Sequence, residues 1–174
     1  MSSPLKPKVG ENDHFQGNEK AVIELVEFGD YQCPHCGHAY PILKKIQKKL
    51  GEDLKFVFRN FPLSEIHPNA VNAAVATEAA ALQQKFWEMH DIIFENQFAL
   101  ETEDLLDYAK KIGLNVDQFK NDLQDEKLLA KVEDDFESGV RSGVNGTPSF
   151  FVNGKKYNGD WEEKPFLEYL KSIL

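Results

Sequence analysis

Cysteine occurs at two positions of this 174-residue chain, and the two positions lie close together: Cys33 and Cys36, in the order Cys-Pro-His-Cys. Two thiols at this spacing can close into a small disulfide ring without moving the fold, so the pair can alternate between dithiol and disulfide. A Cys-x-x-Cys pair placed between a strand and a helix is a strong indication of redox chemistry.

The residues on either side of the pair predict that placement. The apolar run 21–28, AVIELVEF, has the length and the β-branched content of a buried strand. After Cys36, apolar residues recur at helical spacing with lysines between them: Ile42, Leu43, Ile46 and Leu50, beside Lys44, Lys45, Lys48 and Lys49. We therefore expect a strand to end just before Cys33 and a helix to begin beside it.

The start of a helix favours a negatively charged sulfur, because its unpaired N–H groups and its dipole attract anions. Such an interaction is worth up to ~2 kcal/mol and one pKa unit is about 1.4 kcal/mol, so the helix should lower the pKa of Cys33 by roughly one unit. His35 adds a donor or a positive charge, and Pro34, which lacks an N–H, suits the first helical turn. We predict that Cys33 is the exposed nucleophile and that Cys36, one turn further on, is shielded and resolves the mixed disulfide.

Three other uses of the pair compete with this interpretation. A structural disulfide over so short a loop would constrain little of the unfolded chain. A zinc site formed by Cys33 and Cys36 with His35 or His38 has no second cysteine pair to complete it. Covalent haem attachment requires a histidine directly after the second cysteine, where this chain has Gly37.

The composition is that of a globular protein with one domain, since 41% of the residues are hydrophobic and 28% are charged. The net charge is −9, and no block of basic residues is long enough to follow a phosphate backbone, so we expect no nucleic-acid partner. No apolar run reaches transmembrane length, so we expect no membrane partner, and the first residues contain no signal-peptide core. Taken as it stands, the sequence predicts a cytoplasmic protein; a periplasmic or secreted protein whose export signal had been removed would have the same sequence.

The order of the predicted elements indicates an α/β domain with a helical insertion. Residues 1–12 are predicted to be a flexible tail, and residues 54–61, LKFVFRNF, a second strand. Residues of about 64–143 contain five helical patterns, and residues 144–174 contain a hairpin at Asn153-Gly154 followed by a last helix. We therefore expect a core of about 20–63 and 144–174, interrupted by the insertion. The predicted helices place no metal-ligand pattern around His67 or His90, so we expect both to be structural.

With its Cys-Pro-His-Cys pair after a strand, its Thr-Pro before a late hairpin and its inserted helices, the chain resembles the DsbA family of thiol-disulfide oxidoreductases. The segments 26–37, VEFGDYQCPHCG, and 58–63, FRNFPL, resemble the thioredoxin-like DsbA branch. The similarity covers nearly all of residues 12–174. It implies a thioredoxin fold with a helical subdomain inserted between its βαβ and ββα halves.

The resemblance also implies roles for individual residues. Pro148 corresponds to the family's cis-proline, next to which the backbone of Thr147 would pair with an extended substrate, and Gln32 is a further candidate for substrate binding. Glu27 corresponds to a buried acid behind the second cysteine, which can exchange a proton with it. The family's lysine partner for this acid is displaced here: Lys55 is shifted by one residue, and the period of two in a strand would turn it to the opposite face of the sheet.

We therefore predict a thiol-disulfide oxidoreductase whose catalytic residues are Cys33, Cys36, His35, Pro34 and Glu27, with no metal and no cofactor other than the Cys33–Cys36 disulfide. The implied partners are proteins with thiols or disulfides and a redox partner such as a reductase, glutathione or a quinone-linked oxidase. Because His35 stabilises the reduced thiolate, it favours an oxidising couple. The alternatives are a glutathione-linked isomerase or transferase of the same fold, and a metal-handling or redox-inert binding module.

Overall fold

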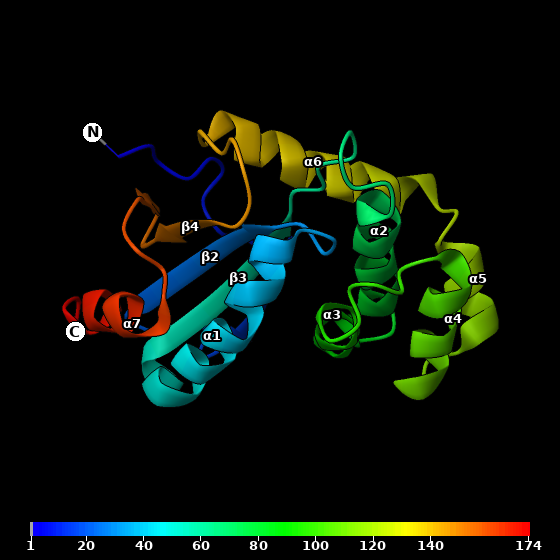
Figure 1. The fold of residues 1–174 in the computed structure, drawn as a ribbon, viewed down its shortest axis with the longest axis horizontal. Coiled ribbons are helices and arrows are strands. Elements are labelled where there is room, and N and C mark those ends of the chain that lie inside the picture. The colour runs from blue at the N-terminus through cyan, green and yellow to red at the C-terminus, as the bar shows by residue number, and fades with distance from the viewer. Residues whose placement is uncertain (1) are drawn as a thin grey trace.

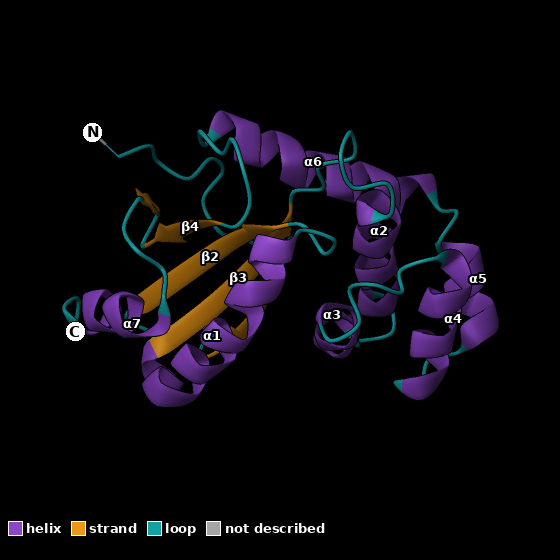
Figure 2. Cartoon of the chain, viewed as in Figure 1, coloured by secondary structure: helices purple, strands orange, loops and turns teal. Residues whose placement is uncertain are grey.

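The computed structural model describes residues 2–174 as one five-stranded sheet with seven α-helices (Figures 1 and 2). The strands are β1 (His14–Gly17), β2 (Ile23–Gly29), β3 (Leu54–Asn60), β4 (Ser149–Val152) and β5 (Lys155–Tyr157). The helices are α1 (Pro34–Leu50), α2 (Ala70–Ala81), α3 (Phe86–Phe94), α4 (Thr102–Lys111), α5 (Val116–Asp122), α6 (Glu126–Arg141) and α7 (Glu163–Lys171), and a 3-10 helix, η1, covers Gly51–Asp53.

The sheet has the strand order β1-β3-β2-β4-β5. Its two central strands, β2 and β3, are parallel, and α1 connects them; the other neighbouring pairs are antiparallel. The hairpin between β4 and β5 turns at Asn153 and Gly154, which both have positive φ, as the predicted two-residue turn requires. The α/β class and the insertion of helices between two halves of the sheet are therefore confirmed.

Side chains alternate between the two faces of the sheet, and each face is covered by different elements. Ile23 and Leu25 of β2 pack with Phe56 of β3 against α1 and α7, which lie on the same side of the sheet (Figure 1). Val26 and Phe28 point to the other face and pack with Phe61, Phe136 and Phe151, beside α6. Glu27 therefore points to the face that α1 covers.

The five inserted helices build a second hydrophobic core beside the sheet (Figure 2). The long helix α6 runs from this helical cluster back along the sheet, so it joins the two parts. The core of the insertion is continuous with the cysteine pair, since Tyr31, Cys33, Cys36 and Phe58 belong to the same cluster of buried residues as α2 and α3. The insertion is thus packed directly against the redox segment.

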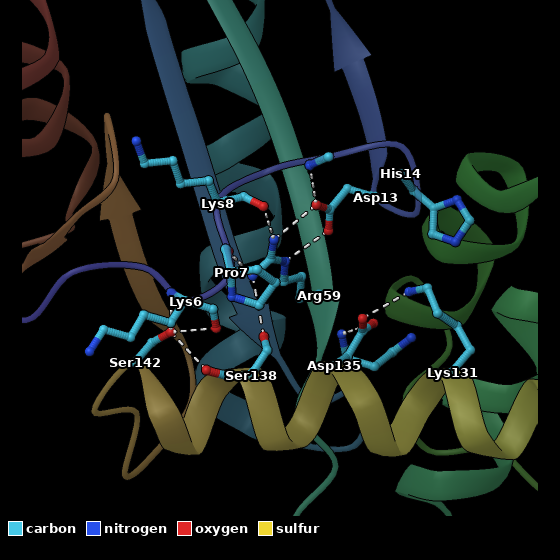
Figure 3. A network of polar contacts seen from close by, with 12 residues as sticks. Lys6, Pro7, Lys8, Asp13, His14, Arg59, Lys131, Asp135, Ser138 and Ser142 are labelled. Carbon is cyan, nitrogen blue, oxygen red and sulfur yellow. Dashed lines mark hydrogen bonds and ion pairs between the residues drawn. The ribbon is translucent and has the colours of Figure 1, made fainter.

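The prediction of a flexible tail is wrong for residues 4–9. Pro4 forms a β-bridge with Lys155, and Leu5 is 4% exposed. The carbonyl groups of Pro7 and Lys8 accept hydrogen bonds from Arg59 of β3, as Figure 3 shows. The sequence signal was misleading because this polar, proline-containing segment forms its contacts with residues more than 50 positions away, which local composition does not reveal.

Candidate redox site

The structure places the cysteine pair at the predicted junction of strand and helix. Cys33 is the N-cap of α1, with extended backbone angles, and Pro34 occupies the first helical turn. The Cys33 N–H donates to the carbonyl of Asp30 at 3.1 Å, and the N–H of Gly37 closes the first turn onto the Cys33 carbonyl at 3.1 Å. The sulfur of Cys33 therefore lies at the end of the helix where N–H groups are unpaired.

The exposure of the two sulfurs differs less than the sequence predicted. Cys36 is completely buried, but Cys33 is also 4% exposed rather than open to solvent. The cover comes from the loop before β4, where the carbonyl oxygen of Thr147 lies 3.6 Å from the Cys33 sulfur. The Thr147–Pro148 peptide bond in this loop is cis. The prediction of an exposed Cys33 is wrong for this conformation, because a loop more than a hundred residues later in the chain packs on it.

The surroundings of Cys33 stabilise its thiolate. The pKa of Cys33 is lowered to about 5, chiefly by the hydrogen bond from the Cys36 thiol. Burial opposes this effect, whereas the backbone N–H groups of Cys36 and His35 add to it. The start of α1 thus lowers the pKa of Cys33 as predicted, but the Cys36 thiol lowers it more.

The structure shows how His35 and Gln32 are placed. The side chain of His35 is exposed, and its contribution to the lowered pKa of Cys33 comes from its backbone N–H. The Gln32 side chain accepts a hydrogen bond from the Asn69 N–H at 2.8 Å and so holds the loop that precedes α2.

Cys36 behaves in the opposite way to Cys33. Burial raises the pKa of Cys36 well above its usual value, and the hydrogen bond that its thiol gives to Cys33 and the negative charges of Glu27 and Cys33 raise it further. A hydrogen bond from the N–H of Asp30 to the Cys36 sulfur, at 3.5 Å, opposes this shift. At neutral pH the pair therefore consists of a thiolate and a thiol that donates to it.

Glu27 is buried next to this pair. It is 1% exposed, and its Oε1 atom has no hydrogen-bond partner. Burial raises the pKa of Glu27 to about 8, and the negative charge of Cys33 adds to the effect. Lys55 is not its partner, because Lys55 lies directly opposite Glu24 in the parallel register and pairs with it at 3.4 Å. The predicted displacement of the lysine to the other face of the sheet is confirmed.

Gln97, which the sequence did not single out, and His90, which we expected to be structural, contact the segment before Cys33. The Gln97 side chain donates to the carbonyl groups of Tyr31 at 2.8 Å and Cys33 at 3.0 Å. The hydroxyl of Tyr31 lies 2.9 Å from Nδ1 of the buried His90. Gly37 permits the approach of Gln97, since an ideal Cβ there would lie 2.0 Å from Gln97 Oε1. Nothing in the sequence pattern indicates these contacts.

His67, which we also expected to be structural, contacts Asp30 near the cysteine pair. Nδ1 of His67, in the loop before α2, lies 2.7 Å from the buried carboxylate of Asp30. Within residues 2–174, no three side chains of His, Cys, Asp or Glu are grouped as metal ligands.

A protein-family model described as Thioredoxin matches residues 9–172. This chain belongs to the thioredoxin family. The match covers the sheet, the cysteine pair and the inserted helices, so the predicted thioredoxin fold is confirmed.

Several solved structures are similar to this chain over most of its length. BdbD from Bacillus subtilis, in its oxidised form, is 27% identical, with a TM-score of 0.83 over 99% of this chain and 97% of that chain. A thiol-disulfide exchange protein, alpha-DsbA2 from Wolbachia pipientis, is 21% identical, with a TM-score of 0.81 over 93% of this chain and 87% of that one. A thioredoxin-like oxidoreductase from Silicibacter pomeroyi is 24% identical, with a TM-score of 0.83 over 94% and 92% of the two chains. The resemblance to DsbA-family proteins is confirmed.

Curated relatives have a different name. A Na(+)/H(+) antiporter NhaA 1 from Mycobacterium sp. (strain KMS) is 40% identical over 170 residues, which is 97% of this chain and 28% of that protein. The chain thus spans about a quarter of the length of these relatives. Within residues 2–174, every helix is too short or too polar to cross a bilayer.

Proposed function

We propose that this chain exchanges disulfides with the thiols of protein substrates through Cys33 and Cys36. The observation that carries the proposal is the environment of Cys33, whose sulfur lies at the start of α1 and receives hydrogen bonds from the Cys36 thiol and from backbone N–H groups. A thiolate is the reactive form in thiol-disulfide exchange, and a pKa of about 5 keeps Cys33 in that form at neutral pH.

In the reductive direction, the Cys33 thiolate attacks one sulfur of a substrate disulfide. The substrate S–S bond breaks, its second sulfur leaves as a thiolate with the bonding electron pair, and a mixed disulfide forms on Cys33. Cys36 then loses its proton and attacks Cys33, which releases the first substrate sulfur and leaves the Cys33–Cys36 disulfide. The substrate gains two electrons and the cysteine pair loses them; the oxidation of a dithiol follows the same steps in reverse.

Glu27 is suited to move the proton of Cys36. Its pKa of about 8 lies near neutrality, so both protonation states are accessible: the ionised carboxyl can take the proton of Cys36, and the protonated carboxyl can return it in the reverse reaction. Thr147 is suited to bind the substrate, because its backbone lies against the Cys33 sulfur, where an extended peptide could pair with it as an added strand. Among the groups present in the chain, the cysteine pair is the redox centre that this reaction requires, and its partners are proteins with thiols or disulfides and a donor or acceptor of electrons.

The test is a comparison of Cys36→Ser with Cys33→Ser. The Cys36→Ser protein retains the nucleophile but lacks the resolving thiol, so it should accumulate mixed disulfides with a disulfide-containing protein such as ribonuclease with scrambled disulfides, whose S–S bond breaks as the bond to Cys33 forms. The Cys33→Ser protein should accumulate at least about tenfold less, because Cys36 is buried and its pKa is raised. Mass spectrometry after an acid quench measures both. Equal trapping by the two variants would contradict the assignment.

The same variants test the glutathione-linked alternative. A glutathione-dependent isomerase or transferase needs one cysteine, so the Cys36→Ser protein would then keep its turnover with glutathione. We expect this turnover to be lost, because the Cys36 thiol both stabilises the Cys33 thiolate and displaces the bound thiol.

A further inference from the structure

Asp30 touches both cysteines through its backbone. Its N–H donates to the sulfur of Cys36 at 3.5 Å, and its carbonyl accepts the N–H of Cys33 at 3.1 Å. A rotation of the backbone at Asp30 would therefore move a donor away from one cysteine and an acceptor away from the other. The orientation of this residue is fixed by its side chain, which is completely buried.

The Asp30 carboxylate is held by three donors from two segments. Its Oδ1 accepts from the Gln32 N–H at 2.8 Å, and its Oδ2 accepts from the Leu63 N–H at 2.9 Å and from Nδ1 of His67 at 2.7 Å. His67 belongs to the loop that leads into the helical insertion, and the His67 N–H donates to the Leu63 carbonyl at 2.9 Å, which closes that loop. His67 is the one side chain among the three donors.

We propose that Asp30 and His67 form a positioning pair that keeps the Asp30 N–H on the Cys36 sulfur and thereby accelerates the displacement of substrate by Cys36. The proposal rests on the proposed function and assigns to it two residues that do not touch the substrate. The bond formed in this step joins the Cys36 and Cys33 sulfurs; the bond broken joins Cys33 to the substrate sulfur, which leaves with the electron pair.

The physical reason is the burial of Cys36. A buried thiol ionises reluctantly, and a hydrogen bond to its sulfur favours the thiolate that must attack. While Cys36 is protonated, the same N–H polarises the S–H group that donates to Cys33. If the imidazole is removed, Oδ2 keeps only the Leu63 N–H as a donor, and a buried carboxylate with too few donors reorients or draws in solvent. Either response displaces the Asp30 backbone from the sulfur.

The test measures the rates of the Cys33 step and the Cys36 step separately in one reaction. Reduced protein is mixed with dithiobis(nitrobenzoate), which releases one coloured thiolate when Cys33 attacks and a second when Cys36 resolves the mixed disulfide. In His67→Ala we expect the second release to slow by about tenfold, which corresponds to about 1.4 kcal/mol of activation free energy, and the first to stay within about twofold. His67→Asn places an amide nitrogen near the position of Nδ1 and should restore most of the second rate.

Two further variants separate positioning from stability. His67→Leu fills the same volume without a donor and should reproduce the effect of His67→Ala in a folded protein. His14→Ala removes a histidine that pairs with the buried Glu78 carboxylate at 2.6 Å and stacks on Phe86, and it should leave both rates unchanged even if the protein unfolds more easily. An unchanged second rate in the first two variants, or an equal loss in His14→Ala, would overturn the proposal.

Failure of the proposed function would look different, because the unmodified protein would then show no rapid first release. In that case the positioning role of Asp30 and His67 can still be tested by titrating the Cys36 thiol in a Cys33→Ser background. His67→Ala should raise the midpoint of this titration relative to His67→Asn, and identical midpoints would contradict the positioning role.

Discussion

At neutral pH, one of the three buried ionisable side chains of the redox site is mainly charged and the other two are mainly neutral. Cys33 is a thiolate, Cys36 is a thiol, and Glu27 has a pKa of about 8, so it is mostly protonated. Each state depends on another: the Cys36 thiol donates to Cys33, and the charge of Cys33 raises the pKa of Glu27. Such divergent pKa values in adjacent groups are typical of sites that move protons during a reaction.

This dependence leads to a prediction about a single substitution. Because the hydrogen bond from Cys36 is the largest contribution that lowers the pKa of Cys33, Cys36→Ala should raise the pKa of Cys33 by at least about one unit. Cys36→Ser is the matched control, since its hydroxyl can still donate, and it should raise the pKa less. Thiolate absorbance in the ultraviolet measures both values. Equal pKa values in the two variants would show that the helix start, and not the neighbouring thiol, controls ionisation.

At the scale of elements, two parts of the helical insertion form hydrogen bonds with the segment 30–33. Gln97, which follows α3, binds two of its carbonyl groups, and the loop before α2 binds the side chains of Asp30 and Gln32. The insertion therefore does more than cover the sheet, since each of these contacts fixes the backbone from which the helix start and Cys33 project. The hydrophobic core that includes Tyr31 and Cys33 adds to this coupling.

Gly37 and Gln97 provide a test of one of these contacts. Gly37→Ala should displace the Gln97 side chain and remove its two hydrogen bonds, which are each worth about 0.5–1.5 kcal/mol. In a Gln97→Ala background the same substitution should be neutral or stabilising, because alanine is favoured over glycine in a helix by about 1 kcal/mol. Urea unfolding of the four proteins gives the coupling energy. Additive effects of the two substitutions would contradict the predicted contact.

The sequence predicted those parts of the fold that depend on local pattern. The strand–cysteine–helix junction follows from the apolar run before Asp30 and the helical spacing after Cys36, and the period of two in β3 correctly turned Lys55 away from Glu27. The contacts of Gln97 and His67 could not be predicted in this way. They join residues 37 to 66 positions apart, and polar residues in loops give no periodic signal.

At the scale of the whole molecule, distant segments meet in a buried polar network around Arg59 (Figure 3). Arg59 of β3 forms two hydrogen bonds with the carboxylate of Asp13, at 2.8 and 2.9 Å, and its guanidinium also contacts the N-terminal segment and Ser138 of α6. Asp135 of α6 accepts from the Asn60 N–H at the end of the same strand. The network joins the N-terminal segment, the sheet and the helix that leads back from the insertion, so these parts should unfold together.

If they unfold together, the charge of Cys33 should change the stability of the whole protein. The folded pKa of Cys33 is about 5 and its usual value is 9.0, so between these values the unfolded reduced chain binds more protons than the folded one. The stability of the reduced protein therefore gains from this group as pH rises from 5 to 9, and the gain is lost as pH falls towards 5. The oxidised protein has no thiol to ionise, and the burial of Glu27 affects both forms.

We therefore expect the difference in unfolding free energy between the reduced and oxidised proteins to favour the reduced form more at pH 7 than at pH 5. The change in this difference should be about 1–2 kcal/mol after allowance for solvent screening near the sulfur. Urea unfolding of both forms at the two pH values measures it. Cys33→Ser forms no disulfide and serves as a control for the reduced protein: its unfolding free energy should lack the gain between pH 5 and pH 7 that the Cys33 thiolate provides. A difference independent of pH would mean that the Cys33 thiolate is not stabilised by the fold. The disulfide would then have no driving force from this source to oxidise a substrate.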